Sequence, residues 1–128
     1  MTRDVAGIGL GLRYDLATEL LERTPKSIAW LEIHPENYLG RGGRYQEMLE
    51  LAREDWPVIT HGLSSGLGSV EPFDASYLKE LGTFLKDLEI PWHTEPLCLA
   101  GPDGRFSHDL LPLPFTDEAA TIASQRLI

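Results

Sequence analysis

The sequence predicts an α/β fold with a parallel sheet, and two observations lead to that prediction. Short apolar stretches that fit strands alternate with stretches of helical periodicity, in the order strand, helix, strand, helix, strand, helix, strand, long loop, helix. Strands that alternate with helices form β/α units, whose strands pair in parallel. Four such units amount to half of a TIM barrel, which typically needs about 250 residues. With 128 residues, the chain is predicted to contain about half a barrel.

The first strand is predicted over residues 5–12, where glycine occupies every second position from Gly7 to Gly11. A nucleotide-binding fingerprint needs its glycines in the turn after a strand, so this pattern does not match one. Glycines on one strand face instead leave space inside a barrel or let another backbone approach. Asp15 is predicted to cap the following helix. The buried stripe of that helix is predicted to contain Leu16, Leu20 and Leu21.

The later elements follow from apolar periodicity and from cap residues. Strands are predicted within residues 27–34 and 56–61, and the glycine-rich segment 62–69 is predicted to be the loop after the second of these. Asp74 and Thr116 are predicted to cap the last two helices. The helical stripes that we expect to be buried comprise Tyr45, Met48, Leu49 and Ala52, and then Tyr77, Leu78, Leu81, Phe84, Leu85 and Leu88.

The whole chain, residues 1–128, is predicted to be the N-terminal part of one TIM-barrel domain. Residues 125–128 lie inside a predicted helix without a C-terminal cap signal, as expected of a truncated chain. Half a barrel by itself would leave apolar strand edges exposed. An open four-stranded sheet is the structural alternative.

Composition and charge exclude several classes of partner. The formal net charge is −9, which argues against a nucleic-acid surface because phosphate binding needs a basic patch. No apolar run approaches the length of a membrane span, and the N-terminus lacks the pattern of a secretory signal. A single cysteine, Cys98, allows no disulfide within the chain and fits the reducing cytoplasm. We therefore expect a cytoplasmic protein.

Polar residues able to bind metal follow the ends of the apolar strands. Side chains alternate between the two faces of a strand, so Glu32 and His34 share one face, and His93 and Glu95 point together. The carboxyl ends of parallel strands meet at one mouth, where ligands bind. Nitrogen and oxygen donors without thiolate favour a hard or borderline metal such as iron, manganese or catalytic zinc. The candidate metal or substrate residues are His61, Glu32, His34, Glu36, Asn37, His93, Glu95, His108 and Asp109.

Each of these residues also has a purely structural interpretation. Glu32 and His34 fit a buried ion pair or a hydrogen-bonded core group, and Glu36 fits a contact with the loop backbone. His108 and Asp109 lie in a predicted loop, where turn or helix capping is common. Their convergence on several strand ends favours the functional interpretation, most of all for His61.

Four motifs, in order along nearly the whole chain, resemble those of the multinuclear non-haem iron-dependent oxidative enzymes, which include the methanobactin-type biosynthesis enzymes. The motifs are Gly9-Leu-Gly-Leu-Arg13, Glu32-Ile-His-Pro-Glu-Asn-Tyr38, His61-Gly-Leu-Ser64 and His108-Asp-Leu-Leu-Pro-Leu-Pro-Phe-Thr116. The resemblance implies a TIM barrel that holds two or three irons at its C-terminal mouth. It also implies oxidation of cysteine or other residues in ribosomally made precursor peptides, with a partner protein that binds the leader. By position, His61 matches a family iron ligand.

Two departures from the family pattern bear on activity. The family commonly has Ser-Glu/Asp-His-Leu on the fourth strand with histidine as a ligand, whereas this chain reads Thr94-Glu-Pro-Leu97. Pro96 has no atom that binds metal, and His93 is three residues away on the other strand face. The second departure is length, because the remaining ligands would come from the second half of the barrel. A second chain that completes the barrel is therefore one expectation.

Three functions are therefore carried forward from the sequence. The first is the iron-dependent oxidation of a precursor peptide. The second is a divalent-metal barrel of the sugar-isomerase or hydrolase type, which polarises a carbonyl or activates water. The third is a metal-poor, non-catalytic fragment that binds a peptide or a partner chain, which the proline at position 96 favours.

Overall fold

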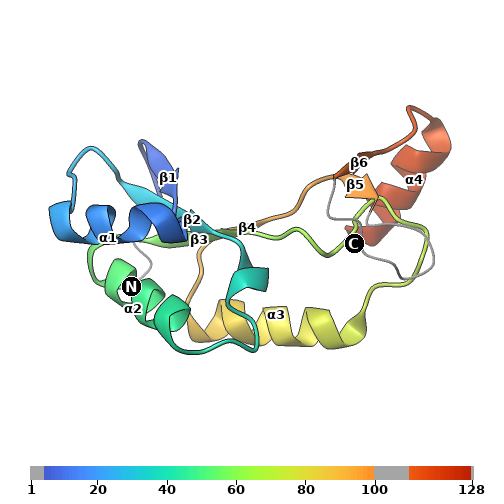
Figure 1. The fold of residues 1–128 in the computed structure, drawn as a ribbon. Coiled ribbons are helices and arrows are strands. Elements are labelled where there is room, and N and C mark those ends of the chain that lie inside the picture. Colours follow the sequence, from blue (N-terminus) through green and yellow to red (C-terminus); the bar gives the residue numbers. More distant parts are fainter. Residues whose placement is uncertain (1–4, 100–109, 128) are drawn as a thin grey trace.

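The computed structural model describes residues 5–99 and 110–127, and Figure 1 shows its fold. Four parallel strands form one sheet in the order β1-β2-β3-β4. The strands are β1 (Gly9–Gly11), β2 (Trp30–Ile33), β3 (Val58–His61) and β4 (His93–Thr94). They alternate with the helices α1 (Tyr14–Arg23), α2 (Arg44–Asp55) and α3 (Ala75–Asp87). This confirms the predicted α/β fold with parallel β/α units, as in part of a TIM barrel.

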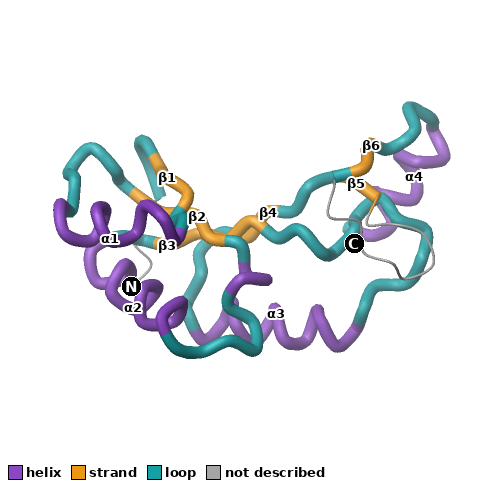
Figure 2. The backbone as a smooth tube through the Cα atoms, viewed as in Figure 1, coloured by secondary structure: helices purple, strands orange, loops and turns teal. Residues whose placement is uncertain are grey.

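Beyond the sheet, the chain forms a second group of elements, in which the final helix was predicted and the pair of short strands before it was not. It consists of the antiparallel pair β5 (Cys98–Leu99) and β6 (Leu111–Pro112), followed by α4 (Asp117–Arg126). This group lies at the opposite end of the structure from α1 and α2 (Figure 2). Arg126 connects it to the rest, because its guanidinium donates to the Glu71 carbonyl at 2.7 Å and stacks 3.7 Å from the centre of the Phe73 ring.

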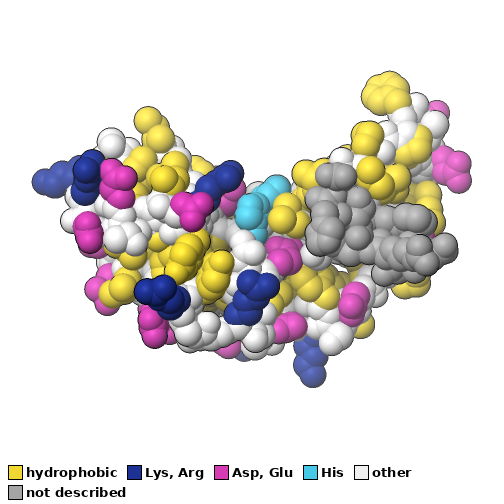
Figure 3. Space-filling model, in the orientation of Figure 1, with side chains coloured by type: hydrophobic (Ala, Val, Ile, Leu, Met, Phe, Trp, Pro, Cys, Tyr) yellow, Lys and Arg dark blue, Asp and Glu magenta, His cyan; other side chains and the backbone are white. Residues whose placement is uncertain are grey.

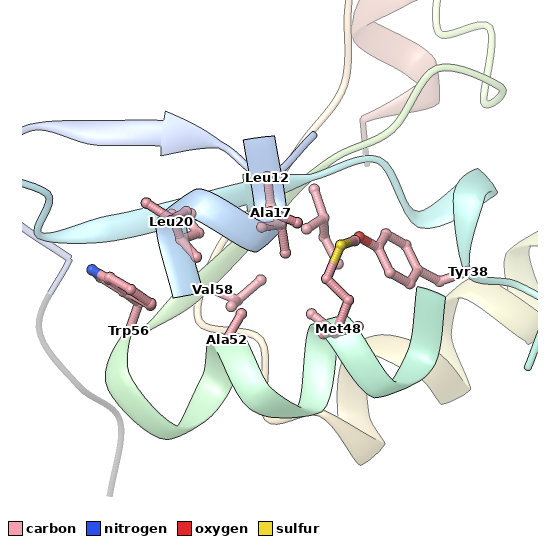
Figure 4. Packing of buried hydrophobic residues seen from close by; sticks show 11 residues of the cluster. Leu12, Ala17, Leu20, Tyr38, Met48, Ala52, Trp56 and Val58 are labelled. Carbon is pink, nitrogen blue, oxygen red and sulfur yellow. The ribbon is translucent and has the colours of Figure 1, made fainter. Parts of the chain in front are cut away.

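The core lies between one face of the sheet and helices α1 and α2 (Figure 4). Leu31 and Ile33 alternate along β2 and are almost completely buried on this face. Ala52 of α2 is also fully buried, and the Trp56 indole donates to the Ile28 carbonyl at 2.9 Å. The core cluster consists of Leu12, Ala17, Leu20, Leu31, Ile33, Tyr38, Met48, Leu49, Ala52, Trp56 and Val58.

The glycines of β1 leave space for an indole ring. Gly9 is aligned with Trp30 in the parallel register, and a Cβ atom at Gly9 would overlap the Trp30 ring. The Trp30 Nε1 atom also donates to the Gly7 carbonyl at 3.3 Å. The interpretation of these glycines as space-making residues is therefore confirmed for Gly9.

Three local predictions need comment. The first strand begins at Gly9 rather than at residue 5, because Gly7 has a φ of +88°, which extended pairing does not allow. Asp15 was wrongly predicted as a cap: the helix begins two residues earlier than that prediction requires, with Arg13 at the N-cap, so Asp15 lies in the first turn. Asp74 and Thr116 do cap their helices through side-chain oxygens.

The predicted buried face of α3 is only partly buried. Leu81 is the single buried residue of that helix, and Leu78 is 37% exposed. The adjacent edge strand β4 has two residues, so it offers little apolar surface for α3 to cover. Among the described helices, none is long and apolar enough to span a membrane.

Candidate functional site

The register of the sheet decides which candidate residues share a face. Glu32 is aligned with Ile59, so Glu32 and His61 lie on the same face, opposite the core. His34 follows β2 in an extended conformation and continues the alternation of Glu32. The structure therefore brings Glu32, His34 and His61 to one face, as predicted.

His34 and His61 lie beside each other on that face. Their ring centroids are 5.8 Å apart, with an angle of 61° between the planes. The His34 Nδ1 atom lies 2.8 Å from the His61 carbonyl oxygen. A carbonyl only accepts, so this nitrogen carries the proton, and the neutral His34 ring has its lone pair on Nε2.

The His61 ring is held in the same way by the neighbouring strand. Its Nδ1 atom lies 2.7 Å from the Thr94 hydroxyl oxygen. The same hydroxyl lies 3.4 Å from the Thr60 carbonyl oxygen, so it can accept from Nδ1 while it donates to that carbonyl. With the proton on Nδ1, the lone pair of His61 lies on Nε2. A hydrogen bond from the second ring nitrogen to a carbonyl or hydroxyl is the usual way in which a metal-binding histidine is oriented.

A pocket of about 380 Å³ opens beside His34. Tyr14 and Tyr45 contribute aromatic surface, with ring centroids 5.3 Å apart. Arg44 donates to the Tyr14 hydroxyl at 3.2 Å. The pocket is lined by Gly11, Leu12, Arg13, Tyr14, Asp15, Glu32, His34, Asn37, Tyr38, Tyr45 and Met48. Histidine side chains reach the surface in the hollow between the α1–α2 part and the α4 part (Figure 3).

Glu36 binds the backbone of the loop after His61 through one carboxylate oxygen. Its Oε1 atom accepts from the amides of Leu63 at 2.7 Å and Ser64 at 3.0 Å, and from the Tyr77 hydroxyl at 2.8 Å. Three donors thus occupy this oxygen. Asn37, its neighbour, is exposed and lines the pocket.

These contacts determine the protonation of Glu36 and Tyr77. Burial by itself would raise the pKa of Glu36, but the hydrogen bonds from Leu63, Tyr77 and Ser64 outweigh it, and the pKa lies below the ordinary value. Burial, followed by the hydrogen bond and the charge of Glu36, raises the pKa of Tyr77 well above its ordinary value. At neutral pH the pair is therefore a carboxylate that accepts from a neutral phenol.

His93 and Glu95 lie on the other face of the sheet from His61. His93 is aligned with Thr60, whose hydroxyl lies 2.8 Å from the His93 Nδ1 atom. The His93 Nε2 atom lies 3.0 Å from Glu95 Oε1, which also accepts from the Ser65 hydroxyl at 2.6 Å. As predicted, the two side chains point together. The alignment of β4 places them behind the sheet, so they do not replace a ligand missing at Pro96.

Two further contributors have no recognisable signal of their own in the sequence. Thr94 orients His61, and Tyr77 reaches Glu36 across 41 residues of sequence. Arg41 and Arg44 are separated by glycines in the sequence but both contact pocket tyrosines, since Arg41 lies 5.9 Å from the Tyr45 ring centroid. The predicted residues His108 and Asp109 lie outside the described residues.

The donor set fits part of a metal site. His34 and His61 offer two imidazoles whose Nε2 atoms have no hydrogen-bond partner within residues 5–99 and 110–127. Glu32 adds a carboxylate to the same face. Within the same residues, no three His, Cys, Asp or Glu side chains gather closely enough to hold a metal ion by themselves. Further donors are therefore needed to complete the coordination of a bound metal.

Comparison with known proteins assigns the chain to a family. The sequence profile of the family described as "RiPP precursor modification enzyme MbnB/TglH/ChrH" matches residues 7–128; RiPPs are ribosomally made, post-translationally modified peptides. A UPF0276 protein of Anaeromyxobacter sp. (strain Fw109-5) is 38% identical over 99% of this chain and 44% of its own length. A UPF0276 protein of Pseudomonas aeruginosa is 37% identical over 96% of this chain and 43% of its own length.

The matches cover almost all of this chain but less than half of each relative, so the chain spans about 44% of the length of the relatives it matches. The family match covers the β/α units that carry His34 and His61 as well as β5, β6 and α4. The chain belongs to the MbnB/TglH/ChrH family of RiPP precursor modification enzymes, of which it represents the N-terminal portion.

Proposed function

We propose that this chain contributes the first half of the active site in an iron-dependent oxidative enzyme that modifies residues such as cysteine in a ribosomally made precursor peptide. The observation that carries the proposal is the pair of imidazoles, His34 and His61, which lie beside each other with Nε2 atoms that no described residue contacts by a hydrogen bond. Membership in a family of precursor-modifying enzymes supports the class of substrate.

His61 and His34 would hold the metal through Nε2. Bound iron would supply the one-electron chemistry by which dioxygen oxidises a substrate. The His61 carbonyl keeps the proton of the His34 ring on Nδ1, and the Thr94 hydroxyl would do the same for His61 by accepting from its Nδ1 atom. Glu32 supplies a carboxylate on the same face, suited to binding metal or holding a proton.

The pocket beside His34 would receive the residue of the peptide that is modified. Its volume of about 380 Å³ is in the usual range for a small ligand site. Tyrosine rings and exposed cations line or border it, and these groups can bind a peptide segment through apolar surface and hydrogen bonds. Asn37 adds an amide at the same place.

The chain would act together with other protein segments. Its relatives are more than twice as long, so the remaining metal ligands would come from the second half of a barrel, on the same or on another chain. A partner protein that binds the leader of the precursor peptide would present the substrate. These partners are part of the proposal.

The test is the iron content of anaerobically purified protein, compared between wild type and the variants His61→Ala, His34→Ala and His93→Ala. We expect bound iron in wild type, loss of it in the first two variants, and retention in the third, because His93 lies on the other face of the sheet. Consumption of dioxygen on addition of precursor peptide would separate this function from a metal-dependent isomerase or hydrolase. Wild-type protein that holds both halves of the barrel and still binds no iron would contradict the proposal.

A further inference from the structure

The loops that follow the two candidate ligands are joined at one carboxylate oxygen. Glu36 lies two residues after His34, and Leu63 and Ser64 lie two and three residues after His61. The amides of Leu63 and Ser64 both donate to Glu36 Oε1, at 2.7 and 3.0 Å. Hydrogen bonds to an ionised carboxylate are stronger than those between neutral groups. The end of β2 is therefore tied to the end of β3 directly beyond both histidines.

Helix α3 adds a third donor to the same oxygen. The Tyr77 hydroxyl donates to Glu36 Oε1 at 2.8 Å. Tyr77 lies in the first turn of α3, where its own amide donates to the Asp74 side chain at 3.1 Å. The cap thus fixes the backbone from which the phenol reaches Glu36.

The same loop is held from its other side by a second carboxylate. The Glu95 side chain is only 9% exposed, and its Oε1 atom accepts from the Ser65 hydroxyl at 2.6 Å. Glu95 also packs against Gly62 so closely that a Cβ atom there would overlap the carboxylate. The segment from Gly62 to Ser65, which follows His61, is therefore held between Glu36 and Glu95.

We propose that Glu36 and Tyr77 are positioning residues that fix the separation of His34 and His61 by clamping the loop after His61 to the end of β2. This inference rests on the proposed metal-binding role of the two histidines. In it, Glu36 acts through the loop backbone and not as a metal ligand. Tyr77 acts through Glu36, and its hydroxyl is the part of the clamp that α3 contributes.

The first measurement tests the clamp without metal. Amide hydrogen exchange of Leu63 and Ser64 is compared by NMR in wild type, Tyr77→Phe and Thr83→Val. Tyr77→Phe removes one hydroxyl and keeps the ring, so exchange at both amides should become roughly 10-fold faster. Thr83→Val is the matched control, because the Thr83 hydroxyl lies on the same helix and, among the described residues, bonds only to the Lys79 carbonyl. Unchanged exchange in Tyr77→Phe would overturn the clamp.

The second measurement tests positioning, with Co²⁺ as a coloured probe titrated into the full chain under anaerobic conditions. Tyr77→Phe should weaken Co²⁺ binding roughly 10-fold at unchanged helical content, and Glu36→Gln should weaken it at least as much. Faster amide exchange with wild-type Co²⁺ affinity would show a purely structural contact and overturn the inference. If His61→Ala keeps wild-type Co²⁺ affinity, the proposed metal-binding function fails instead. Amide exchange is measured without metal, so it shows independently whether the clamp exists.

Discussion

The His34 Nδ1 atom lies 2.8 Å from the carbonyl oxygen of His61, so the backbone of one candidate ligand orients the ring of the other. This single contact fixes the tautomer of His34 and ties together the ends of two neighbouring strands. The pair is pre-organised by hydrogen bonds of the apoprotein, so little side-chain ordering remains for metal binding.

Thr94 should control the metal affinity of His61. Thr94→Val removes the hydroxyl that lies 2.7 Å from the His61 Nδ1 atom, while the shape of the side chain stays nearly the same. We expect metal binding to weaken about 10-fold, as is typical when the hydrogen-bond partner of a ligand is lost. Thr94→Ser, which keeps the hydroxyl, should behave like wild type in a calorimetric titration with Fe²⁺. Equal affinities for the valine and serine variants would contradict the assigned role of Thr94.

Substitution by alanine should change the stability of the fold in opposite directions at Gly9 and at Gly82. A Cβ atom at Gly9 would overlap the Trp30 ring, so Gly9→Ala should destabilise the fold by about 1–3 kcal/mol. Gly82 lies in α3 with no atom within 4 Å of an added Cβ, so Gly82→Ala should stabilise it by up to about 1 kcal/mol. Urea unfolding at equilibrium measures both changes. An unchanged free energy of unfolding in Gly9→Ala would show that Trp30 does not need this space.

Glu36 should make the stability of the fold depend on pH in the acid range. Its pKa is lower in the folded chain than the ordinary value of 4.5, so the folded state favours the ionised form. This contribution to stability is fully present above about pH 4.5 and is lost as the pH falls through the lower pKa of the folded state. The free energy of unfolding of wild type and Glu36→Gln should therefore differ most near neutral pH and converge in acid. A difference in unfolding free energy that stays constant with pH would contradict the lowered pKa of Glu36.

The fold was predictable because it depends on local patterns. The alternation of strand and helix periodicity is enough to indicate parallel β/α units, and the side chains of Asp74 and Thr116 mark helix starts. Asp15 is the same type of residue in the same type of position but does not cap. The chain leaving β1 turns into the helix at Arg13, and a residue pattern alone does not determine that turn.

The site was predictable only where one strand determines it. Alternation along β2 correctly groups Glu32 with His34, because His34 directly continues the extended backbone of that strand. Whether His93 lies with His61 depends on the alignment of β4 with β3, and a shift of one residue reverses the face. The roles of Thr94 and Tyr77 likewise depend on contacts between distant segments, which a single sequence does not specify.

The most direct test of the account is the protonation state of the two histidine rings, measured by long-range nitrogen–proton NMR correlation at neutral pH. We predict that His34 and His61 both carry the proton on Nδ1, and that the Nε2 resonances of both shift when Zn²⁺ is added as a diamagnetic probe. His93 should show no such shift, because its Nε2 atom lies 3.0 Å from Glu95. Nε2-protonated rings at His34 and His61, or a zinc response confined to His93, would contradict the proposed metal site.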